Sequence, residues 1–322
     1  MITLAEAKVG MADKFEQSVV DEFRRSSRLL DLLPFDDAVS PGTGGSTLTY
    51  GYTLLLTPST ASGRAINKNY TANEAKRSPK TVNLKIFGGS FSIDRVIANT
   101  SGSIDEVNFQ LNQKIIGAKN LFHYLVINGD STVQDSAGDY LEFDGLNRLL
   151  AGASTVVTST VDISTSALLD TNYQAFLDEV DEWLGKLDEK PDALLMNGKM
   201  LTKMKSVARR AGYYSRSEDA FGRGVDNYDG IEMIDLQKYY NGTNTVDCIA
   251  TDATSGKTDI YAVKFGQNAF HGVSVNGSKI IDTHLPDFTT AGAVKEGDVE
   301  FVAAVALKST LKAGKLAGIK VQ

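Results

Sequence analysis

Residues 128–150 of the chain, NGDSTVQDSAGDYLEFDGLNRLL, are the stretch on which our fold prediction depends most. The pair Asn128-Gly129 predicts the end of a helix, because both residues tolerate the left-handed backbone found after a last helical turn. A loop at 130–144 follows, and it leads through Asp144-Gly145-Leu146 into a short apolar segment. The loop contains no lysine or arginine and five carboxylates: Asp130, Asp135, Asp139, Glu142 and Asp144.

The segment before this loop, residues 103–128, predicts a long helix. Ser103 and Glu106 form the S-x-x-E capping box that marks a helix start. Apolar residues recur at every third or fourth position, which places them on one face of a rod roughly 39 Å long at ~1.5 Å per residue. Those residues are Ile104, Val107, Leu111, Ile115, Ala118, Phe122 and Leu125.

Further upstream, the sequence predicts strands. Leu48–Leu56 and Thr81–Ala98 are rich in β-branched and aromatic residues. Gly88 and Gly89 predict a bend or bulge in the second run. With the polar residues 57–80 between them, the two runs predict a long two-stranded excursion. It contains too little apolar material to be stable alone, so we expect it to rest on something else.

The N-terminal residues 4–33 predict a helix that ends before Pro34. It has an apolar stripe but no following helix to pack on, and two interpretations stay open. It is either an ordinary domain helix or an arm that buries its stripe on a neighbouring subunit. Residues 40–46, SPGTGGS, predict a flexible hinge after it. The stripe consists of Leu4, Ala7, Met11, Phe15, Val19, Phe23 and Leu30.

The second half of the chain predicts helices and strands in mixed order. Residues 166–188 and Lys199–Ala211 predict amphipathic helices, with a short strand at Ala193–Met196 between them. Asn197 is placed to cap the second of these helices, and Gly212 to end it. From Ile231 onward the chain predicts mostly strands, the last at Glu300–Lys312 and Ala317–Val321.

One side of the predicted helix at Lys199–Ala211 is cationic. We interpret it as a solvated face; the other interpretation is a face for nucleic acid or an acidic partner. Its basic residues are Lys199, Lys203, Lys205, Arg209 and Arg210.

The overall composition is that of a folded protein. The chain has 322 residues, 42% of them hydrophobic and 23% charged, which excludes wholesale disorder. Its net charge of −7 argues against a dedicated nucleic-acid binder. No segment approaches the ~20 apolar residues of a membrane span. The N-terminus has no apolar stretch of signal-peptide length, so we expect synthesis in the cytoplasm.

No group of residues predicts catalysis, a cofactor or a metal. The histidines His123, His271 and His284 are not spaced as metal ligands. Residues 255–258, SGKT, lack the earlier glycine of a phosphate-binding loop and predict an exposed turn. The single cysteine, Cys248, is expected to be a small buried residue.

The order of the elements resembles that of the major capsid proteins of tailed bacteriophages. Their Hong Kong-type phage fold is shared with encapsulins and herpesvirus capsids. Residues 1–40 look like the N-terminal arm of these proteins, 47–100 like the extended E-loop, and 103–128 like the spine helix of the peripheral P domain. The element Asp144-Gly145-Leu146 is similar to the one that follows their spine helix.

Further similarities lie in the second half. Residues 191–214, PDALLMNGKMLTKMKSVARRAGYY, resemble the strand–Asn–helix unit of the axial A domain. Residues 228–236, YDGIEMIDL, resemble the next strand, although Glu232 stands where these proteins often have proline. Ile260–Phe270 is similar to the strand before the return to the P domain, and Val299–Lys312 to the long P-domain strand.

The resemblance implies an α+β fold, the tailed-phage capsid fold, with N-terminal arm, extended E-loop, long spine helix, P domain and A domain. It also implies domain boundaries. They are 1–46 for the arm, 47–100 for the E-loop, 101–149 and 287–312 for the P domain, and 150–286 for the A domain, with 313–322 returning to it.

The function implied by the resemblance is structural, not enzymatic. The chain would be a major head protein that self-assembles as hexamers and pentamers into an icosahedral shell around double-stranded DNA. It would be assembled in the bacterial host cytoplasm and reside in the virion, without a membrane partner. Because the sequence begins directly with the arm, either a separate scaffolding protein is implied or an extension is missing, and a portal is expected. DNA contact would be weak and non-specific, and we predict no cross-linking.

Two oppositely charged segments are expected to meet between subunits, because the family's E-loop lies over the P domain of the next subunit. Residues 64–85 carry a net charge of +5, with Glu74 as their one acid, and residues 130–144 carry −5. Exposed ion pairs contribute only about 0–1 kcal/mol each, so they would set the register, while burial of the arm stripe contributes more. The basic residues are Arg64, Lys68, Lys76, Arg77, Lys80 and Lys85, and the stripe residues Met11, Phe15, Val19 and Phe23.

Three other functions stay open. One is an encapsulin-like nanocompartment shell that holds protein cargo instead of DNA. Another is an enzyme with an unusual site, built from Asp and Glu pairs in residues 178–192. The third is a tail or adhesion protein, against which the long helix and the mixed order of helices and strands argue.

Overall fold

The computed structural model describes residues 27–38, 47–57, 59–100, 106–212, 215–218, 224–275 and 281–322. Several sequence-based expectations fall outside these residues. They are the arm stripe Met11, Phe15, Val19 and Phe23, the hinge at 40–46 and the cap residue Ser103.

The described elements follow one another in mixed order. The first half contains α2 (Arg28–Leu32), β1 (Phe35–Asp37), β2 (Thr49–Thr57), β3 (Lys76–Asn83), β4 (Lys85–Asp94), α3 (Arg95–Thr100), α4 (Glu106–Asn128) and α5 (Leu146–Leu149). The middle contains β5 (Val156–Thr158), α6 (Ser166–Leu184), β6 (Ala193–Met196), α7 (Gly198–Ala211), β7 (Ser215–Glu218), β8 (Gly224–Tyr228), β9 (Ile231–Asp235), β10 (Lys238–Tyr240) and β11 (Thr245–Asp247). The last part contains β12 (Lys257–Val263), β13 (Phe270–Ser274), β14 (Ile281–His284), β15 (Val294–Leu307), a 3₁₀ turn (Thr310–Lys312) and β16 (Ala313–Lys320).

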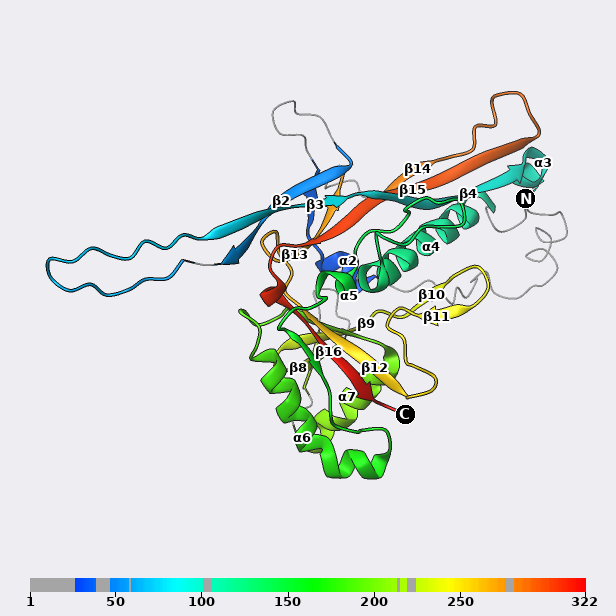
Figure 1. Cartoon of the computed structure of the whole chain (residues 1–322). Helices are drawn as coiled ribbons and strands as arrows, with labels where there is room; N and C mark the ends of the chain where they lie inside the picture. Colours follow the sequence, from blue (N-terminus) through cyan, green and yellow to red (C-terminus); the bar gives the residue numbers. More distant parts are fainter. Residues whose placement is uncertain are drawn as a thin grey trace.

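A five-stranded sheet forms the upper part of the molecule in Figure 1, with the strand order β1-β13-β15-β14 and with β4 paired to β15. The β4–β15 pair is antiparallel and runs from Lys85 opposite Ala303 to Asp94 opposite Val294. The long helix α4 lies under this pair. Phe122 of α4 packs against Phe87 of β4 and Phe301 of β15, with ring centroids 6.2 and 5.3 Å apart.

A seven-stranded sheet forms the lower part, with the order β5-β16-β12-β6-β9-β8-β7. Helices α6 and α7 cover its outer face (Figure 1), and Phe176 and Met200 are buried there. Its other face packs toward α4, where Leu195 and Val263 join the same apolar cluster as Phe122. The two sheets therefore share a core, and the four residues of β6 are buried on both faces.

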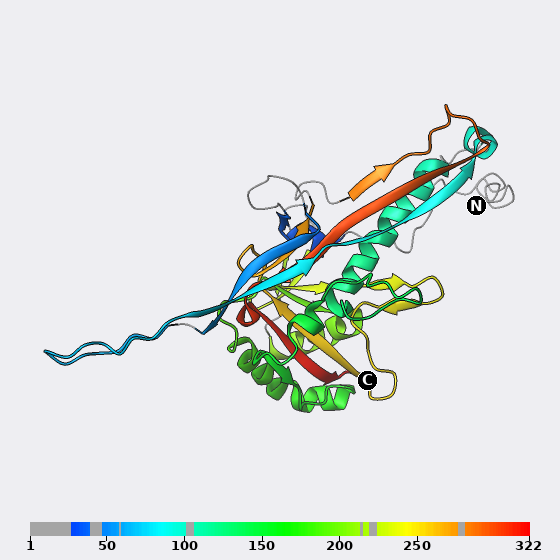
Figure 2. The same ribbon diagram turned by 45° about the horizontal axis from the view of Figure 1, so that its top comes forward.

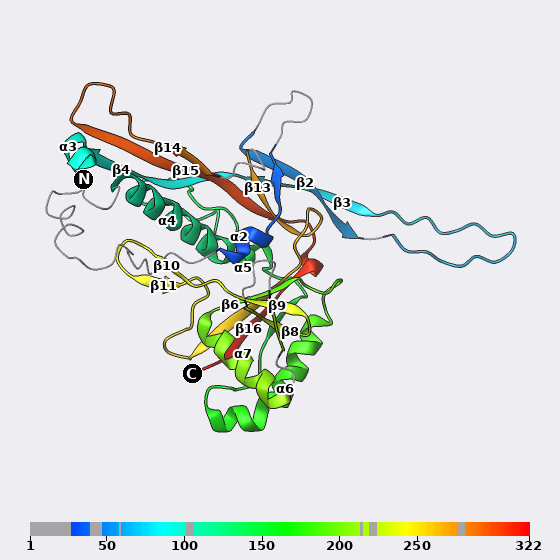
Figure 3. The same ribbon diagram turned by 180° about the vertical axis from the view of Figure 1, so that it is seen from behind.

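The hairpin of β2 and β3 projects far from the rest of the chain, and the three views agree on this (Figures 1, 2 and 3). The residues that join the two strands, 59–75, are exposed. At the base, the amide of Leu84 donates to the carbonyl of Leu48. The E-loop expected from the sequence is thus a long hairpin that is attached to the body at its base only.

Most helix predictions are confirmed, and some boundaries are wrong. Helix α4 ends at Asn128 as predicted, and α7 has Asn197 as its N-cap and a left-handed Gly212 after its end. Helix α6 ends at Leu184 instead of 188, because Gly185 closes it.

The run at Thr81–Ala98 is not one strand. Strand β3 already begins at Lys76, and β4 starts after Leu84. Asp94 then accepts a hydrogen bond from the amide of Val96, which turns the chain into α3, so Ala98 is helical.

The long final strand differs as well. It was expected at Glu300–Lys312, but β15 begins at Val294 and stops at Leu307. Strands β13 and β14 both pair with β15. We therefore propose that the return to the P domain occurs before Phe270, and not at residue 287.

Candidate intersubunit surfaces

The tip of the E-loop is held in shape by local contacts. The Arg64 guanidinium donates to the carbonyl of Lys68 at 3.2 Å and lies 5.5 Å from the centroid of the Tyr70 ring. The side chains of Asn73 and Thr60 are also hydrogen-bonded to each other across the loop. Ile66 and Tyr70 remain 89% and 63% exposed. The tip therefore presents two apolar side chains among cations, a combination that favours contact with another surface.

Five of the six E-loop cations have no carboxylate partner among the residues that the structure describes. They are Arg64, Lys68, Lys76, Arg77 and Lys80. The sixth, Lys85, lies at the base, where its Nζ donates to the carbonyl of Tyr140 at 2.5 Å. This contact joins the E-loop to the loop at 130–144 within one chain.

The loop at 130–144 uses several of its carboxylates internally. Arg148 lies 3.1 Å from Asp130 Oδ2 and 3.2 Å from Asp144 Oδ1. Hydrogen bonds from Thr132, together with the charge of Arg148, hold the pKa of Asp130 below its usual range. Arg148 follows the acidic stretch by only a few residues, and our sequence reasoning assigned it no role.

Two more carboxylates of this loop accept backbone hydrogen bonds. Glu142 accepts from the amide of Asp130 at 3.0 Å. Asp135 accepts from the amides of Ala137 and Asp139, both at 2.9 Å, and so closes a turn. Asp139 is exposed, and its carboxylate has no bonded partner in the described chain. Four of the five acidic residues expected to contact a neighbour therefore already stabilise their own loop.

A pocket lies between the base of the E-loop and this loop. Tyr140, which lines it, is half exposed, with 50% of its surface accessible. Its position makes it a candidate contact site for another copy. It is lined by Thr81, Val82, Asn83, Lys85, Ser131, Tyr140, Phe143 and Asp144.

The described end of the arm is anchored on the spine helix α4. Ser27 caps α2, and its Oγ lies 2.7 Å from Nε2 of His123 in a buried contact. Burial, with the nearby charge of Lys119, lowers the pKa of His123 to about 4. Arg28 reaches the other way and makes a bidentate ion pair with Glu232 of β9 at 2.7 and 3.0 Å. The first residues that the structure describes are thus held to the body by two polar contacts.

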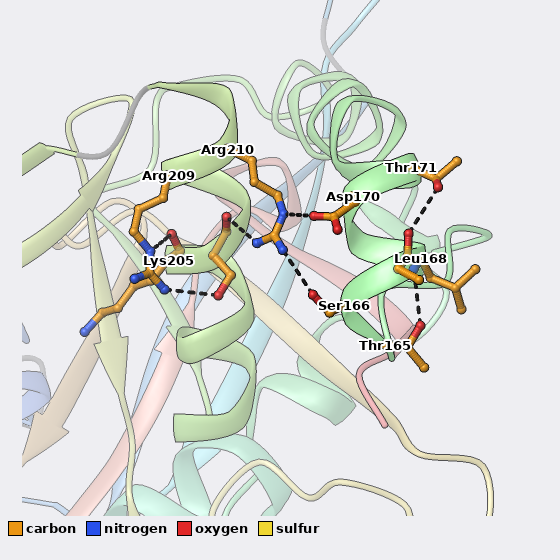
Figure 4. A network of polar contacts seen from close by, with 10 residues as sticks. Thr165, Ser166, Leu168, Asp170, Thr171, Lys205, Arg209 and Arg210 are labelled. Atoms are coloured by element: carbon orange, nitrogen blue, oxygen red, sulfur yellow. Dashed lines mark hydrogen bonds and ion pairs between the residues drawn. The ribbon is translucent and has the colours of Figure 1, made fainter.

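The cationic side of α7 is largely used within the chain (Figure 4). Arg210 lies 2.5 Å from Asp170 and 3.3 Å from Ser166, both on α6. Arg209 folds back on its own helix, and Lys205 pairs with Asp226 at 2.5 Å. Lys203 donates to two carbonyls before α6, and burial lowers its pKa. These cations hold α7 to its neighbours, which leaves the nucleic-acid interpretation of this face without support.

Other expectations concern the remaining polar residues. Cys248 is buried. The exposed turn expected at residues 255–258 is only partly right: a turn lies at 253–255, where Asp252 accepts from the amides of Thr254 and Ser255, but Lys257 and Thr258 already belong to β12 and Thr258 is buried. Within the described ranges, no three His, Cys, Asp or Glu side chains are grouped as a metal site, and no helix is long and apolar enough to cross a membrane.

Comparison with known proteins shows a similarity in structure but not in sequence. No known protein family and no curated protein matches the sequence. Among solved structures, the holo-SrpI encapsulin complex of Synechococcus elongatus is similar, with a TM-score of 0.64 and 14% identity, over 100% of this chain and 97% of the other. Mycobacterium phage Bobi matches with a TM-score of 0.62 and 12% identity, over 98% of each chain. The capsid of Myoviridae phage XM1 matches with 0.54 and 13%, over 99% of each. The chain therefore has the tailed-phage capsid fold, which encapsulins share.

Proposed function

We propose that this chain is a shell-forming major capsid protein, which packs as hexamers and pentamers into a closed icosahedral head around double-stranded DNA. The observation that carries the proposal is the E-loop. A two-stranded hairpin is marginal in water, and this one projects from the body with five cations that have no carboxylate partner in the described chain. Such a projecting hairpin is stabilised when it lies on another copy of the chain.

The fold gives a second line of support. Structures with this fold include the capsids of phage XM1 and of a gene transfer agent, each of which covers nearly all of this chain. The apolar arm stripe predicted for residues 4–30 would supply the larger part of the association free energy, because burial of apolar surface contributes roughly 25 cal/mol per Å². On this proposal the protein resides in the virion and meets a scaffolding protein and a portal during assembly.

The first experiment is negative-stain microscopy combined with sedimentation of the purified chain at low and high salt, with and without a scaffolding protein from the same phage. Shells, hexameric or pentameric rings, or tubular polyheads are the expected result. A chain that stays monomeric even with the scaffold contradicts the proposal. Nuclease-protected DNA in native particles supports the phage head, whereas particles filled with protein and free of DNA indicate a nanocompartment.

A charge reversal in the E-loop tests whether its cations act in assembly. Lys76→Glu combined with Arg77→Glu is expected to lower the yield of assembled particles and to weaken its dependence on salt, because these cations act between copies. A matched reversal on α6, Asp178→Lys with Glu182→Lys, changes exposed charges far from the hairpin and serves as the control. Unchanged yield and salt dependence in the E-loop variant would show that its charges do not act in assembly.

A further inference from the structure

The chain contains Asn-Gly pairs at 128–129, 197–198, 241–242 and 276–277, and the last of them lies outside the described residues. In such a pair the backbone nitrogen of the glycine can attack the side-chain amide of the asparagine, because no β-carbon shields that nitrogen. Three features of the folded chain control this attack. They are the exposure of the pair, the hydrogen bond of the glycine N–H and the hydrogen bonds of the asparagine side chain.

The pair at 128–129 is protected by hydrogen bonds on both reacting groups. Asn128 Nδ2 donates to the carbonyls of Tyr124 and Cys248, at 3.3 and 2.7 Å. The amide of Gly129 donates to the carbonyl of Leu125 at 2.9 Å. The attacking nitrogen and the nitrogen that would leave are therefore both held in place.

The pair at 197–198 is protected by burial. Asn197 is only 2% exposed. Its Nδ2 donates to the carbonyl of Ile249 and to the hydroxyls of Thr251 and Thr258, at 2.9, 3.0 and 2.8 Å. Loss of this nitrogen would break three hydrogen bonds in the interior, so the folded chain opposes the reaction here as well.

The pair at 241–242 lies at the turn that joins β10 to β11, in a hairpin beside α4 (Figure 1). Asn241 and Gly242 are both exposed. Neither Nδ2 of Asn241 nor the amide of Gly242 has a hydrogen-bond acceptor in the described chain. Gly242 has a φ of 92°, in the left-handed region that favours glycine, so the turn itself requires this residue. Both reacting nitrogens are thus free at this pair.

The oxygen of the same side chain is held by two backbone donors. Asn241 Oδ1 accepts from the amides of Thr243 and Asn244, at 3.0 and 2.8 Å. When the Gly242 nitrogen attacks Cγ, this oxygen becomes the oxyanion of a tetrahedral intermediate. Donors that already point at such an oxygen stabilise the negative charge as it develops. The turn therefore lowers the barrier and leaves the departing nitrogen without a partner.

We propose that Asn241 is a site of spontaneous deamidation that is promoted by the turn of residues 241–244. The amide of Gly242 loses its proton to solvent base, and its nitrogen forms a bond to Cγ of Asn241. The bond between Cγ and Nδ2 breaks, Nδ2 takes up a proton and leaves as ammonia, and a succinimide ring closes. Water then opens the ring at Cγ to give aspartate, or at the backbone carbonyl to give isoaspartate. Water is consumed, ammonia is released, and the chain gains a negative charge.

The aspartate product fits the turn. Asp252 accepts from the amides two and three positions further along the chain, at 2.8 and 2.6 Å, as Asn241 does. These hydrogen bonds hold the pKa of Asp252 below its usual range. An aspartate at position 241 is therefore charged and keeps both contacts. Isoaspartate instead inserts a side-chain carbon into the main chain, which changes the spacing between β10 and β11.

Peptide mapping by mass spectrometry measures the reaction. The purified, folded chain is incubated at mildly alkaline pH and digested at acidic pH, where ring closure is slow. We expect Asn241 to react at least about tenfold faster than Asn128 and Asn197, because breaking the hydrogen bonds of the leaving nitrogen raises the barrier at those two. In urea the three pairs should react at similar rates. The proposal is wrong if Asn241 reacts no faster than the other two in the folded chain.

Variants at the next residue test the role of the turn. Thr243→Pro removes an amide that donates to Asn241 Oδ1 and leaves the Asn-Gly pair intact. It should slow deamidation of the folded chain about threefold or more, because an oxyanion donor is lost, and leave the rate in urea unchanged. Thr243→Ala keeps the amide and is the matched control. An unchanged rate in folded Thr243→Pro would overturn the role that the proposal gives to the turn.

Discussion

The amide of Gly145 donates a hydrogen bond to the carbonyl of Gly129 at 2.9 Å, which brings the two ends of the acidic loop together below the spine helix. Neither position has room for a side chain. A β-carbon on Gly145 would lie 2.5 Å from the carbonyl oxygen of Leu125, and one on Gly129 would overlap the carbonyl oxygen of Phe143. The Asp-Gly-Leu element therefore exists because the returning chain passes this close to the last turn of α4.

Gly145→Ala is accordingly expected to destabilise the chain strongly. The backbone atoms that a β-carbon would meet cannot move without breaking the end of α4, so we expect a loss of roughly 3 kcal/mol in the free energy of unfolding. Urea unfolding of the unassembled chain measures it. The control is Gly117→Ala in the exposed part of α4, where nothing lies within 4 Å and alanine should add up to about 1 kcal/mol. Equal urea midpoints for Gly145→Ala and the parent chain would contradict the close approach.

The buried side chain of Asn197 has two structural roles. Its Oδ1 accepts from the amide of Met200 at 2.8 Å and caps α7, while its Nδ2 donates to the carbonyl of Ile249 and to Thr258 Oγ1 at 2.9 and 2.8 Å. Asn197→Ala should cost roughly 3 kcal/mol, because it removes the cap and leaves buried acceptors unpaired. Thr165→Ala removes only a cap from α6 and should cost about 1 kcal/mol. Similar losses in thermal or urea unfolding would show that the Nδ2 contacts contribute little.

The sequence predicts the elements that carry their own signals. Helix α7 has periodic apolar residues, a capping Asn197 and a terminal Gly212, and its bounds differ from the prediction by one residue. Strand β4 has no such signal at its start, because β3 and β4 follow each other through Leu84 with little change in pattern. Their separation depends on the partner strands, β2 for one and β15 for the other.

Charged groups on the candidate surfaces can be predicted from the sequence only where they are neighbours along the chain. The E-loop cations form a local run, so the sequence identifies them directly. The carboxylates of β15 do not stand out, because Glu296, Asp298 and Glu300 share one side of the sheet only through the alternation of that strand, and Asp282 lies opposite Glu300 only through strand pairing. The engagement of Asp130 by Arg148, 18 residues later, likewise depends on the folded loop.

His123 makes the stability of the chain depend on pH. Burial lowers its pKa from 6.5 to about 4, so between these values the unfolded chain binds more protons than the folded one. The free energy of unfolding should therefore rise with pH across this window, by roughly 3 kcal/mol in total, and gain nothing further above it. His123→Gln should remove this part of the slope when urea unfolding is compared between pH 4 and 7.

A companion variant separates titration from packing at this position. Ser27→Ala removes the hydroxyl that contacts His123 and caps α2, but it leaves the imidazole buried. It should lower the free energy of unfolding by about 1–2 kcal/mol at every pH and keep the slope. If the free energy of unfolding depends on pH in the same way in the parent chain and in His123→Gln, His123 does not change its protonation on unfolding.

The ion pair between Arg28 and Glu232 couples α2 to the seven-stranded sheet. The pair is bidentate and only partly exposed, with 26% and 16% of the side chains accessible. Glu232 also uses its amide, which donates to the carbonyl of Asp192 at 3.3 Å, so proline at this position would remove that bond and the ion pair together.

Arg28 has further contacts, which means that a single substitution does not measure the ion pair between Arg28 and Glu232. A double-mutant cycle with Arg28→Met, Glu232→Gln and the combination isolates it, and we expect a coupling free energy of about 1 kcal/mol in urea unfolding. The coupling should shrink in high salt, because the pair is partly exposed. If the two substitutions are additive at low salt, the ion pair does not couple α2 to the sheet, and Ser27 and the apolar side chains of α2 hold this segment to the body without it.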